Sequence, residues 1–476
     1  ELEWINGPIT ATVIKDEAID MEFGTGVMTI TPWHDATDFE IARRHSLDKE
    51  QIIDFNGKLL DIAGEFKGIH IKKARPLIAE RLKEKGLLEK IDENYSHRVA
   101  TNSRGGGMIE PQIKEQWFVK MEPLAEMAIH AIEKGSIKFI PDNYRKIFLY
   151  WMENTLDWNI SRQIVWGIPI PAKLCDQCGA GVPDLDNSIT KCLTCGGAVR
   201  QDSDTFDTWF SSGQWPYLAL GYPNHSDFQT YYPTDVMETG HDLIFRWVPR
   251  MVIFGLYRAK EAPFHTVYLH GLVNDAKGKK MSKSKGNVIN PLELSKKYGT
   301  DALRMGLMVG NTPGTNLSLS EDKIKAYKHF ANKIWNASKF VLAAIENADL
   351  VTQPKLAAED QKSLDELKAI TEEITADMEA YRLYLAAEKL YHYFWHTFAD
   401  KIVEEAKPRL RSEDAGGKLS AQWTLLTILS TSLKLLHPFM PFVTETVWGQ
   451  MPHQKETLLM IAEWPRFDSS NNKDES

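Results

Sequence analysis

The sequence is poor in cysteine and has no long hydrophobic run. Its 4 cysteines all lie between Cys175 and Cys195, so a thiolate metal site or a disulfide can form only there. No uninterrupted apolar stretch approaches the roughly 20 residues that cross a bilayer, which predicts a chain without a membrane span. The first residues, Glu1–Trp4, show neither an initiator methionine nor a signal-peptide pattern. We therefore expect a cytoplasmic protein and a chain that is entered part-way through a domain.

Positive charge is also in deficit. The 56 lysines and arginines do not balance 65 acidic residues, and the formal net charge is -9. Because the overall field repels a polyanion, any nucleic-acid partner must bind to local basic surface. Hydrophobic residues at 43% and charged residues at 25% are typical of an ordinary globular protein. The length predicts about three domains, and we find no internal repeat.

The most informative stretch is the lysine segment, Lys277–Asn287, which reads KGKKMSKSKGN. It follows the strand-like run Thr266–Val273 and precedes Val288–Pro291, where we predict the start of a helix. Gly278 and Gly286 let the backbone approach a ligand closely, and lysine ammonium groups can follow phosphate oxygens as charge develops on them. The pattern therefore favours a polyphosphate-binding loop. A solvated basic loop or a general nucleic-acid patch is the alternative.

The cysteines form two pairs of the type Cys-x-x-Cys. Cys175 and Cys178 are separated by 13 residues from Cys192 and Cys195. Four thiolates on two such knuckles can close a tetrahedral zinc site with no position left for a substrate, so we predict a structural zinc ion. Disulfides are the alternative, but no secretory feature indicates an oxidising compartment.

The first hundred residues predict a small mixed α/β unit. Strand-like runs occur at Ile9–Ile14 and Val27–Thr31, and helical patterns occur at Phe39–His45 and Ala74–Leu87.

Within this unit the string TPWHDATDFE ends at the start of a helix. Its spacing predicts that Asp35 is the N-cap and that Asp38 is a first-turn acid. The same geometry would place both carboxylates and the Thr31 hydroxyl at one helix mouth, where they could bind an ammonium group and a hydroxyl.

Two further strings, DTFDTWFSS and ETGHDLIFRW, are candidates for a small-molecule pocket. The second begins a predicted apolar helix that runs to about Tyr257. An acid, Asp242, near Trp209 and Trp247 would suit a small, branched, zwitterionic ligand. In the alternative reading, Asp242 pairs with Arg246 four residues on, and the tryptophans are ordinary core residues.

From Leu317 onward the pattern is wholly helical, with Ser320 as a predicted N-cap. Further helices are expected at Gln361–Ala380, Arg382–Ala406 and Ala421–Leu436, with breaks at Gly416-Gly417 and His437-Pro438.

These motifs together resemble class I aminoacyl-tRNA synthetases. KMSKS at Lys280–Ser284 is similar to the loop that clamps the ATP phosphates in that class, and WNISRQIVWG resembles a signature of its valyl and isoleucyl members. TPWHDATDFE and TGHDLIFRWVPRM resemble the valyl-tRNA synthetase family. HFANKIWNASKFV and LHPFMPFVTETVW resemble its helical anticodon-binding domain.

The resemblance implies a multidomain α/β fold. The implied parts are the C-terminal part of an α/β editing domain (1–95), a connection back into the catalytic domain (96–172), a zinc-ribbon insertion (173–200), the second half of a Rossmann-like catalytic domain with the KMSKS loop (201–318), an all-α helical-bundle anticodon-binding domain (319–467) and a disordered tail (468–476).

The resemblance also implies roles for individual residues. Lys280 and Lys283 would be catalytic, because they contact the ATP phosphates and stabilise the leaving pyrophosphate. The ATP site would comprise His270, Gly271, Leu272, Lys280, Met281, Ser282, Lys283 and Ser284. The amino-acid pocket would comprise Trp209, Asp242, Leu243 and Trp247, with Asp242 on the α-amino group. The editing pocket would comprise Phe23, Thr31, Asp35 and Asp38.

The implied reaction is ATP-dependent activation of valine to valyl-adenylate, followed by transfer to tRNA(Val). Magnesium would arrive with ATP. Editing of mischarged threonyl-tRNA is implied as well, because an apolar pocket rejects an added hydroxyl only weakly.

The family's His-x-Gly-His signature occurs nowhere in the sequence. We therefore expect a portion that is inactive in adenylation alone, a separate N-terminal half as a partner and a monomer in the complete enzyme. A portion of an isoleucyl-tRNA synthetase and a non-catalytic tRNA-binding module are the alternatives.

Overall fold

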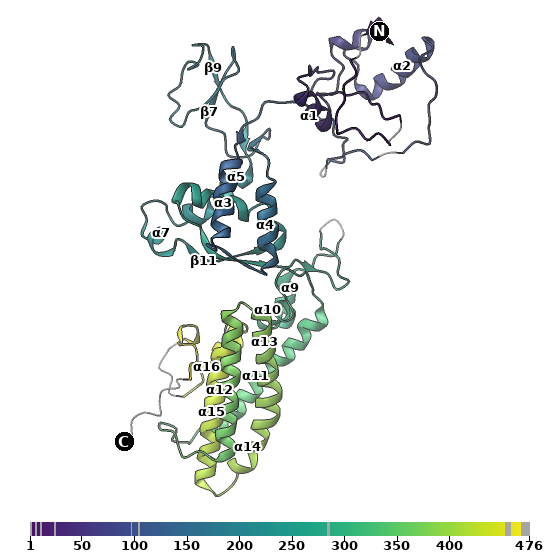
Figure 1. Ribbon diagram of the computed structural model, residues 1–476. Coiled ribbons are helices and arrows are strands. Elements are labelled where there is room, and N and C mark those ends of the chain that lie inside the picture. The colour runs from purple at the N-terminus through teal and green to yellow at the C-terminus, as the bar shows by residue number, and fades with distance from the viewer. Residues whose placement is uncertain are drawn as a thin grey trace. The chain divides into compact units, whose positions relative to one another are not determined.

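The computed structural model describes residues 2–4, 7–9, 12–22, 25–96, 98–102, 105–282, 286–452 and 458–467. The predicted site residues Phe23, Lys283 and Ser284, and the predicted tail 468–476, lie outside the described residues. The chain forms two compact units, Glu1–Trp117 and Phe118–Ser476 (Figure 1). Among the described helices, none combines the length and the hydrophobicity needed to span a bilayer.

In its described residues, the first unit contains two short strands, two helices and one 3-10 helix. They are β1 (Leu2–Trp4), β2 (Gly7–Ile9), α1 (Ala36–Arg44), η1 (Asp61–Phe66) and α2 (Ile71–Glu84). Strands β1 and β2 pair antiparallel. A small buried cluster of Ile53, Leu59, Phe66 and Ala74 joins η1 and α2. The predictions of helices at 39–45 and 74–87 are thus confirmed, with each helix starting three residues earlier.

The predicted strand at Val27–Thr31 is wrong, because this stretch is irregular. Val27 and Met28 are 73% and 49% exposed, so the run has no sheet neighbour against which to bury its apolar side chains. Of the predicted run Ile9–Ile14, the structure gives strand only up to Ile9 among the described residues, and residues 12–14 are irregular.

The second unit begins as a mixed α/β part. Its strands are β3 (Phe118–Val119), β4 (Lys138–Ile140), β5 (Trp158–Asn159), β6 (Ser161–Arg162), β7 (Ala172–Cys175), β8 (Gly181–Pro183), β9 (Val199–Gln201), β10 (Thr205–Phe206), β11 (Thr234–Gly240), β12 (Phe264–His270), β13 (Val273–Asn274) and β14 (Leu317–Ser318). Its helices up to this point are α3 (Glu122–Glu133), α4 (Asn143–Glu153), α5 (Thr208–Ser212), α6 (Trp215–Leu218), α7 (Ser226–Tyr231), the 3-10 helix η2 (His241–Leu243), α8 (Val248–Phe254), the π-helix η3 (Gly255–Ala259), α9 (Pro291–Tyr298) and α10 (Thr300–Met308).

The centre of this part is a parallel sheet with the order β11-β12-β4. Its apolar face is buried with α3, α4 and α8 in one cluster that includes Phe139, Phe148, Met251 and Val267. Because β11 and β12 are parallel, their carboxyl ends meet, and Gly240 is the register partner of His270. In open parallel sheets ligands bind outside these ends.

The predicted long helix up to Tyr257 is broken into η2, α8 and η3. Pro249 stands at the start of α8, where it lacks an N–H and restricts the residue before it, so a continuous helix is disfavoured at this point.

A separate antiparallel sheet, with the order β8-β7-β9, carries the cysteine pairs. Cys175 ends β7, and Cys192 lies in the loop before β9.

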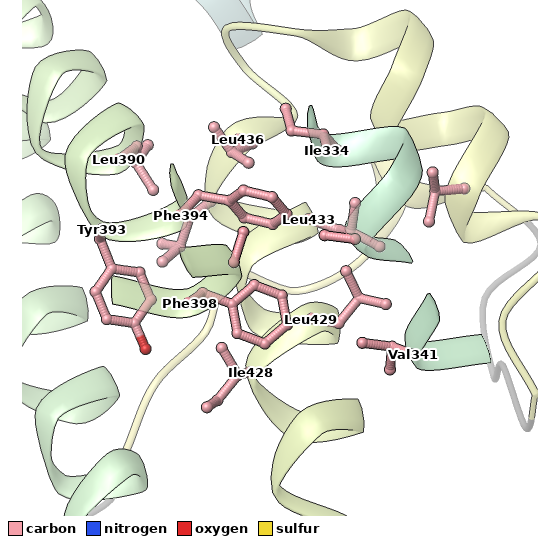
Figure 2. Packing of buried hydrophobic residues seen from close by; sticks show 14 of the residues in the cluster. Ile334, Val341, Leu390, Tyr393, Phe394, Phe398, Ile428, Leu429, Leu433 and Leu436 are labelled. Carbon is pink, nitrogen blue, oxygen red and sulfur yellow. The ribbon is translucent and has the colours of Figure 1, made fainter. Parts of the chain in front are cut away.

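The remainder of the second unit is a helical bundle (Figure 1). It comprises α11 (Glu321–Ile345), α12 (Ala358–Glu379), α13 (Leu383–His392), the π-helix η5 (Tyr393–Ile402), α14 (Val403–Leu410), α15 (Ala415–Leu436), α16 (Pro441–Trp448) and the 3-10 helix η6 (Leu459–Ile461). Figure 2 shows its core, in which Phe394 and Phe398 lie 5.2 Å apart between ring centroids and pack with leucines of α15. Ser320 is the N-cap of α11, as predicted, since its side chain accepts the Lys323 N–H.

The predicted break at Gly416-Gly417 is wrong, because both glycines lie in the first turn of α15. Asp414 caps this helix by accepting the Gly416 N–H, and glycines cost little there because first-turn N–H groups have no partner within the helix. The break at His437-Pro438 is confirmed, since α15 ends at Leu436.

Candidate functional site

The lysine segment begins in a tight turn after β13. The Asp275 carboxylate accepts the backbone N–H groups of Lys277 and Lys279, both at 2.9 Å. Gly278 has a φ of 74°, a conformation that glycine adopts without strain. Lys280 then forms an antiparallel bridge with Asn274. The turn therefore brings the exposed Lys280 back beside the end of β13.

Asn287 closes the other end of this segment. Its side-chain amide donates to Asp275 Oδ2 at 2.9 Å and to the Lys280 carbonyl at 3.3 Å, while its oxygen accepts the Ser282 N–H at 2.9 Å. The bond from Asn287, together with the N–H of Lys279, lowers the pKa of Asp275. The Met281 sulfur accepts the N–H of Ile289 at 3.4 Å. The structure thus positions Lys280 and Ser282 through Asn287, which sequence reasoning missed, and Met281 through Ile289.

Three predicted site residues converge on Gly240, at the carboxyl end of β11. A Cβ atom at Gly240 would lie 2.8 Å from Asp242 Oδ1, and 3.7 Å from both His270 Cε1 and Leu272 Cδ2. Only a residue without a side chain leaves room for the Asp242 carboxylate here. The predicted amino-acid and adenine residues therefore share one edge of the sheet.

Asn316 fixes this edge from the loop before β14. Its Oδ1 accepts the Leu272 N–H at 2.8 Å and lies 2.9 Å from His241 Nε2. Gly271 is required at this crossing, because a Cβ atom there would lie 1.7 Å from the Thr315 carbonyl oxygen. The sequence gives no local signal for Asn316, since it follows His241 by 75 residues.

The two predicted tryptophans come from neighbouring helices. Trp247 donates its Nε1–H to the Ser212 carbonyl at 2.9 Å, which joins the start of α8 to the end of α5. Trp209 lies in the first turn of α5, and its N–H is capped by Asp207 at 3.3 Å. Both indoles are partly exposed. Trp247 also packs against the buried cluster of the sheet and α8, and the role of both tryptophans in an amino-acid pocket stays a prediction.

Asp242 forms no ion pair with Arg246 within the described part of the chain, so the alternative role of these two residues as a helix-surface pair is not realised. The Arg246 guanidinium instead lies 5.2 Å from the centroid of the Phe245 ring.

Asp207 is a third residue that the motifs did not single out. It is 6% exposed, accepts the Trp158 Nε1–H at 3.0 Å and pairs with Arg162 at 2.8 Å. Trp158 and Arg162 both belong to the string WNISR, so this string holds the N-cap of the helix that carries Trp209.

A cavity of about 340 Å³ lies beside α8, but its lining includes none of the four predicted amino-acid residues. Trp158 lines it together with Arg250, whose guanidinium lies 4.4 Å from the centroid of the Trp158 ring. Burial lowers the pKa of Arg250. We assign the candidate site to the strand ends, where polar groups converge, rather than to this cavity.

In the first unit, the structure brings Thr31 and Asp38 together. The buried Asp38 carboxylate accepts the Thr31 N–H at 2.6 Å, and the Thr31 hydroxyl lies 3.4 Å from the same oxygen. Asp35 accepts the N–H groups of Thr37 and Asp38 and is the N-cap of α1. The predictions of Asp35 as N-cap and of Asp38 as a first-turn acid are therefore confirmed.

Trp33 and His34 anchor this loop to a distant segment. Trp33 donates to Gln112 Oε1 at 3.1 Å. The N–H of Ile52 donates to His34 Nε2 at 3.2 Å, and His34 Nδ1 lies 3.1 Å from the Pro111 carbonyl. Since Nε2 accepts, the ring carries its proton on Nδ1.

The four cysteine sulfurs meet as predicted, all within 4.8 Å of one another. Cys175 Sγ lies 3.5 Å from Cys195 Sγ, and Cys178 Sγ lies 3.6 Å from Cys192 Sγ. Tetrahedral zinc bonded to sulfur at about 2.3 Å requires sulfurs about 3.8 Å apart. All four cysteines are free, so the predicted alternative of disulfides is not formed.

Comparison with known proteins shows the family of the chain. Residues 33–186 and 180–320 match the family described as tRNA synthetases class I (I, L, M and V). The chain belongs to this class I tRNA synthetase family. Residues 360–476 match the anticodon-binding domain of tRNA ligase. The predicted class of fold, a class I catalytic part with a helical anticodon-binding domain, is thus confirmed.

Similar class I synthetases include three bacterial proteins named valine–tRNA ligase. The chain is 45% identical to the protein of Carboxydothermus hydrogenoformans over 98% of its own length and 53% of that protein's. It is 44% identical to the protein of Petrotoga mobilis, over 96% of this chain and 53% of that protein. It is 41% identical to the protein of Clostridium perfringens, over 98% of this chain and 53% of that protein. The chain therefore spans about half the length of the curated relatives that it matches.

Solved structures of class I synthetases share the fold. Mycobacterium tuberculosis methionyl-tRNA synthetase in complex with methionyl-adenylate matches with a TM-score of 0.59 at 19% identity, covering 74% of this chain and 67% of that one. A leucyl enzyme of Agrobacterium radiobacter K84, in a ternary complex with tRNA and LeuAMS, matches with a TM-score of 0.53 at 21% identity, covering 65% and 43%.

Proposed function

We propose that this chain takes part in the reaction of a valine–tRNA ligase, which activates valine with ATP and transfers it to tRNA(Val). The observation that carries the proposal is the 41–45% identity to valine–tRNA ligases over 96–98% of the chain. The convergence of Asp242, His270 and Leu272 around Gly240 supports it, because these groups stand where open parallel sheets bind their ligands.

In this proposal two groups of residues at the strand ends bind valine and ATP separately. Asp242 holds the valine ammonium group, while Trp209, Leu243 and Trp247 surround its side chain. The stretch His270–Leu272 lies along the adenine, and Lys280, together with Lys283, binds the ATP phosphates through the lysine segment. Magnesium enters with ATP, because hard oxygen ligands on the phosphates are what it prefers.

We further propose that the first unit contributes to editing and that the cysteines bind zinc. The buried Asp38 beside Thr31 supports a polar pocket for a threonyl group, with Asp35 and Phe23 nearby in sequence. The sulfur spacing supports a structural zinc ion, which would hold the two knuckles together. The division into domains predicted from the sequence, including 1–95 as editing domain and 173–200 as zinc ribbon, stays a prediction.

The test is valine-dependent exchange of pyrophosphate into ATP. It is run on this chain alone and on the chain mixed with a separately produced N-terminal half of a valine–tRNA ligase. We expect exchange in the mixture and a loss of at least about a hundredfold with Lys280→Ala, because the lysine contributes transition-state charge stabilisation. Lys325→Ala is the matched control, since this lysine is exposed on α11.

Three outcomes would contradict the proposal. Exchange that depends on isoleucine would assign the other branched substrate, and an unchanged rate with Lys280→Ala would remove the lysine segment from the chemistry. Binding of tRNA without exchange in the mixture would point to a non-catalytic tRNA-binding module.

A further inference from the structure

The lysine segment is held at its base by one side-chain pair that no motif assigns. Asn287 and Asp275 lie 2.9 Å apart between Nδ2 and Oδ2, and both are partly exposed. Each also binds backbone on its own side. Asp275 accepts two N–H groups of the turn, and Asn287 binds the backbone of Lys280 and Ser282. The pair therefore joins the turn before Lys280 to the residues after it.

We propose that Asn287 and Asp275 are positioning residues that hold the backbone of Lys280 in the geometry needed to meet a nucleoside triphosphate. This inference rests on the proposed function, because it concerns the same phosphate-binding segment. Neither side chain would touch the substrate. They would act through Lys280, whose carbonyl accepts from Asn287 and whose strand partner is Asn274.

The chemistry of the pair explains why these two residue types occur here. An amide offers donors and an acceptor in one group, so Asn287 can donate to Asp275 and to the Lys280 carbonyl while it accepts from Ser282. A carboxylate at 287 would accept only and would face the carboxylate of Asp275.

Asp275 is an anion among lysines, where an unpaired carboxylate would compete with phosphate. Its oxygens instead accept from two backbone N–H groups and one amide. Asp275 therefore holds the backbone of the turn and does not compete with phosphate for the lysines.

The first experiment measures hydrogen exchange on the chain alone, so it does not depend on catalysis. In Asn287→Ala the Ser282 amide should exchange roughly three- to tenfold faster than in the wild type, because its acceptor is lost. Asn290→Ala is the matched control. Asn290 is the exposed N-cap of α9, three residues further on, and it bonds to neither Lys280 nor Ser282. Equal Ser282 exchange in the wild type and Asn287→Ala would overturn the proposal.

The second experiment measures ATP–pyrophosphate exchange in the reconstituted mixture. We expect Asn287→Ala to raise KM for ATP or lower kcat by roughly tenfold, through the loss of one or two hydrogen bonds, with KM for valine unchanged. A merely destabilised protein would show a smaller active fraction and unchanged KM values. Asn287→Asp should be at least as impaired as Asn287→Ala.

The exchanged pair, Asp275→Asn with Asn287→Asp, should recover part of the activity, because an amide again faces a carboxylate and the Ser282 N–H keeps an acceptor. Additive losses in the double variant would contradict a coupled pair.

If Lys280→Ala leaves the rate of ATP–pyrophosphate exchange unchanged, the proposed function itself fails. If Lys280→Ala abolishes exchange while Asn287→Ala changes neither KM for ATP nor kcat, only the present inference fails.

Discussion

The four thiols of the cysteine knuckles have unequal surroundings. The N–H groups of Cys195 and Thr194 lower the pKa of Cys192 to about 6, and those of Cys178 and Gln177 lower the pKa of Cys175. The Gly197 N–H lowers the pKa of Cys195 as well, but the neighbouring Cys175 and Cys178 sulfurs outweigh it and the net shift is upward. The thiol surroundings are thus unequal, and a bound cation would favour the thiolate form of all four cysteines.

At this scale we predict one zinc ion per chain. Removing it with a chelator should speed hydrogen exchange at the amides of Gln177 and Thr194, because their N–H groups donate to Cys175 Sγ and Cys192 Sγ at 3.4 Å. Elemental analysis of the purified chain is the check. Cys192→Ser should lower the zinc content. Ser188→Ala should not, because Ser188 lies in the loop between β8 and β9 near the cysteines but is not a ligand. A wild-type chain free of zinc would remove the metal from the proposal.

The cysteines also show which site residues can be predicted from the sequence and which cannot. Their spacing predicted the cluster because two knuckles fix their own local geometry. Asn316 was missed because it bonds to His241 and Leu272, which lie 75 and 44 positions away along the chain. Asp207 caps α5 locally, but its bond to Trp158 spans 49 positions. A single Asp or Asn carries no periodic signal that would reveal such a partner.

At the scale of elements, α1 depends on the loop before it. Asp35 caps the helix, and Asp38 in its first turn reaches back to the Thr31 N–H, so the loop and the helix end hold each other. The same two acids were predicted both as helix-capping residues and as an editing site. The geometry confirms Asp35 as the N-cap and Asp38 as a first-turn acid, whereas the editing role of both acids stays a prediction.

Replacing Asp38 separates these roles. If the first unit edits, Asp38→Ala should slow hydrolysis of threonyl-tRNA by roughly ten- to a hundredfold, because a charge-assisted hydrogen bond is lost. The measurement is deacylation of threonyl-tRNA by the reconstituted mixture. Glu40→Ala, an acid two residues further along α1, is the control for helix charge. A normal rate with Asp38→Ala would leave only the capping role.

Other elements show the same division between local and distant causes. Helices α2, α11 and α12 were predicted because their apolar spacing lies within each segment, and α11 also carries its own N-cap, Ser320. The strand predicted at Val27–Thr31 failed, since a strand needs a partner that its own residues do not reveal. The continuous helix predicted up to Tyr257 was wrong for a different reason, because the apolar periodicity runs on through Pro249, where the helix starts anew.

At the scale of the whole molecule, one joint links the α/β part to the helical bundle within the second unit. Helix α16 has no side-chain cap of its own, and Asp301 from α10 takes that role by accepting the N–H groups of Phe442 at 3.1 Å and Val443 at 2.7 Å. Arg304, one turn further on, donates to the carbonyls of Pro438 and Phe439. Since α10 follows the lysine segment closely, the joint ties the candidate phosphate site to the bundle.

The joint should make stability depend on pH in a specific direction. Burial raises the pKa of Asp301 even though the N–H groups of Val443 and Phe442 oppose the shift. The folded protein then binds this proton more tightly than the unfolded chain, whose Asp pKa is about 3.9. The stabilisation from the proton is complete below that value and is lost as pH rises through the raised native pKa.

Urea unfolding at several pH values from 4 to 7 tests this. In Asp301→Asn the group no longer titrates, so the decline in unfolding free energy across that window should be smaller than in the wild type. Asp301→Ala should cost about 0.5–2 kcal/mol at neutral pH, as expected for a lost helix cap, and should speed hydrogen exchange at Phe442 and Val443. Asp322→Ala, at the exposed start of α11, is the control. Parallel pH profiles for the wild type and Asp301→Asn would show that the titration of Asp301 does not contribute to the pH dependence of stability.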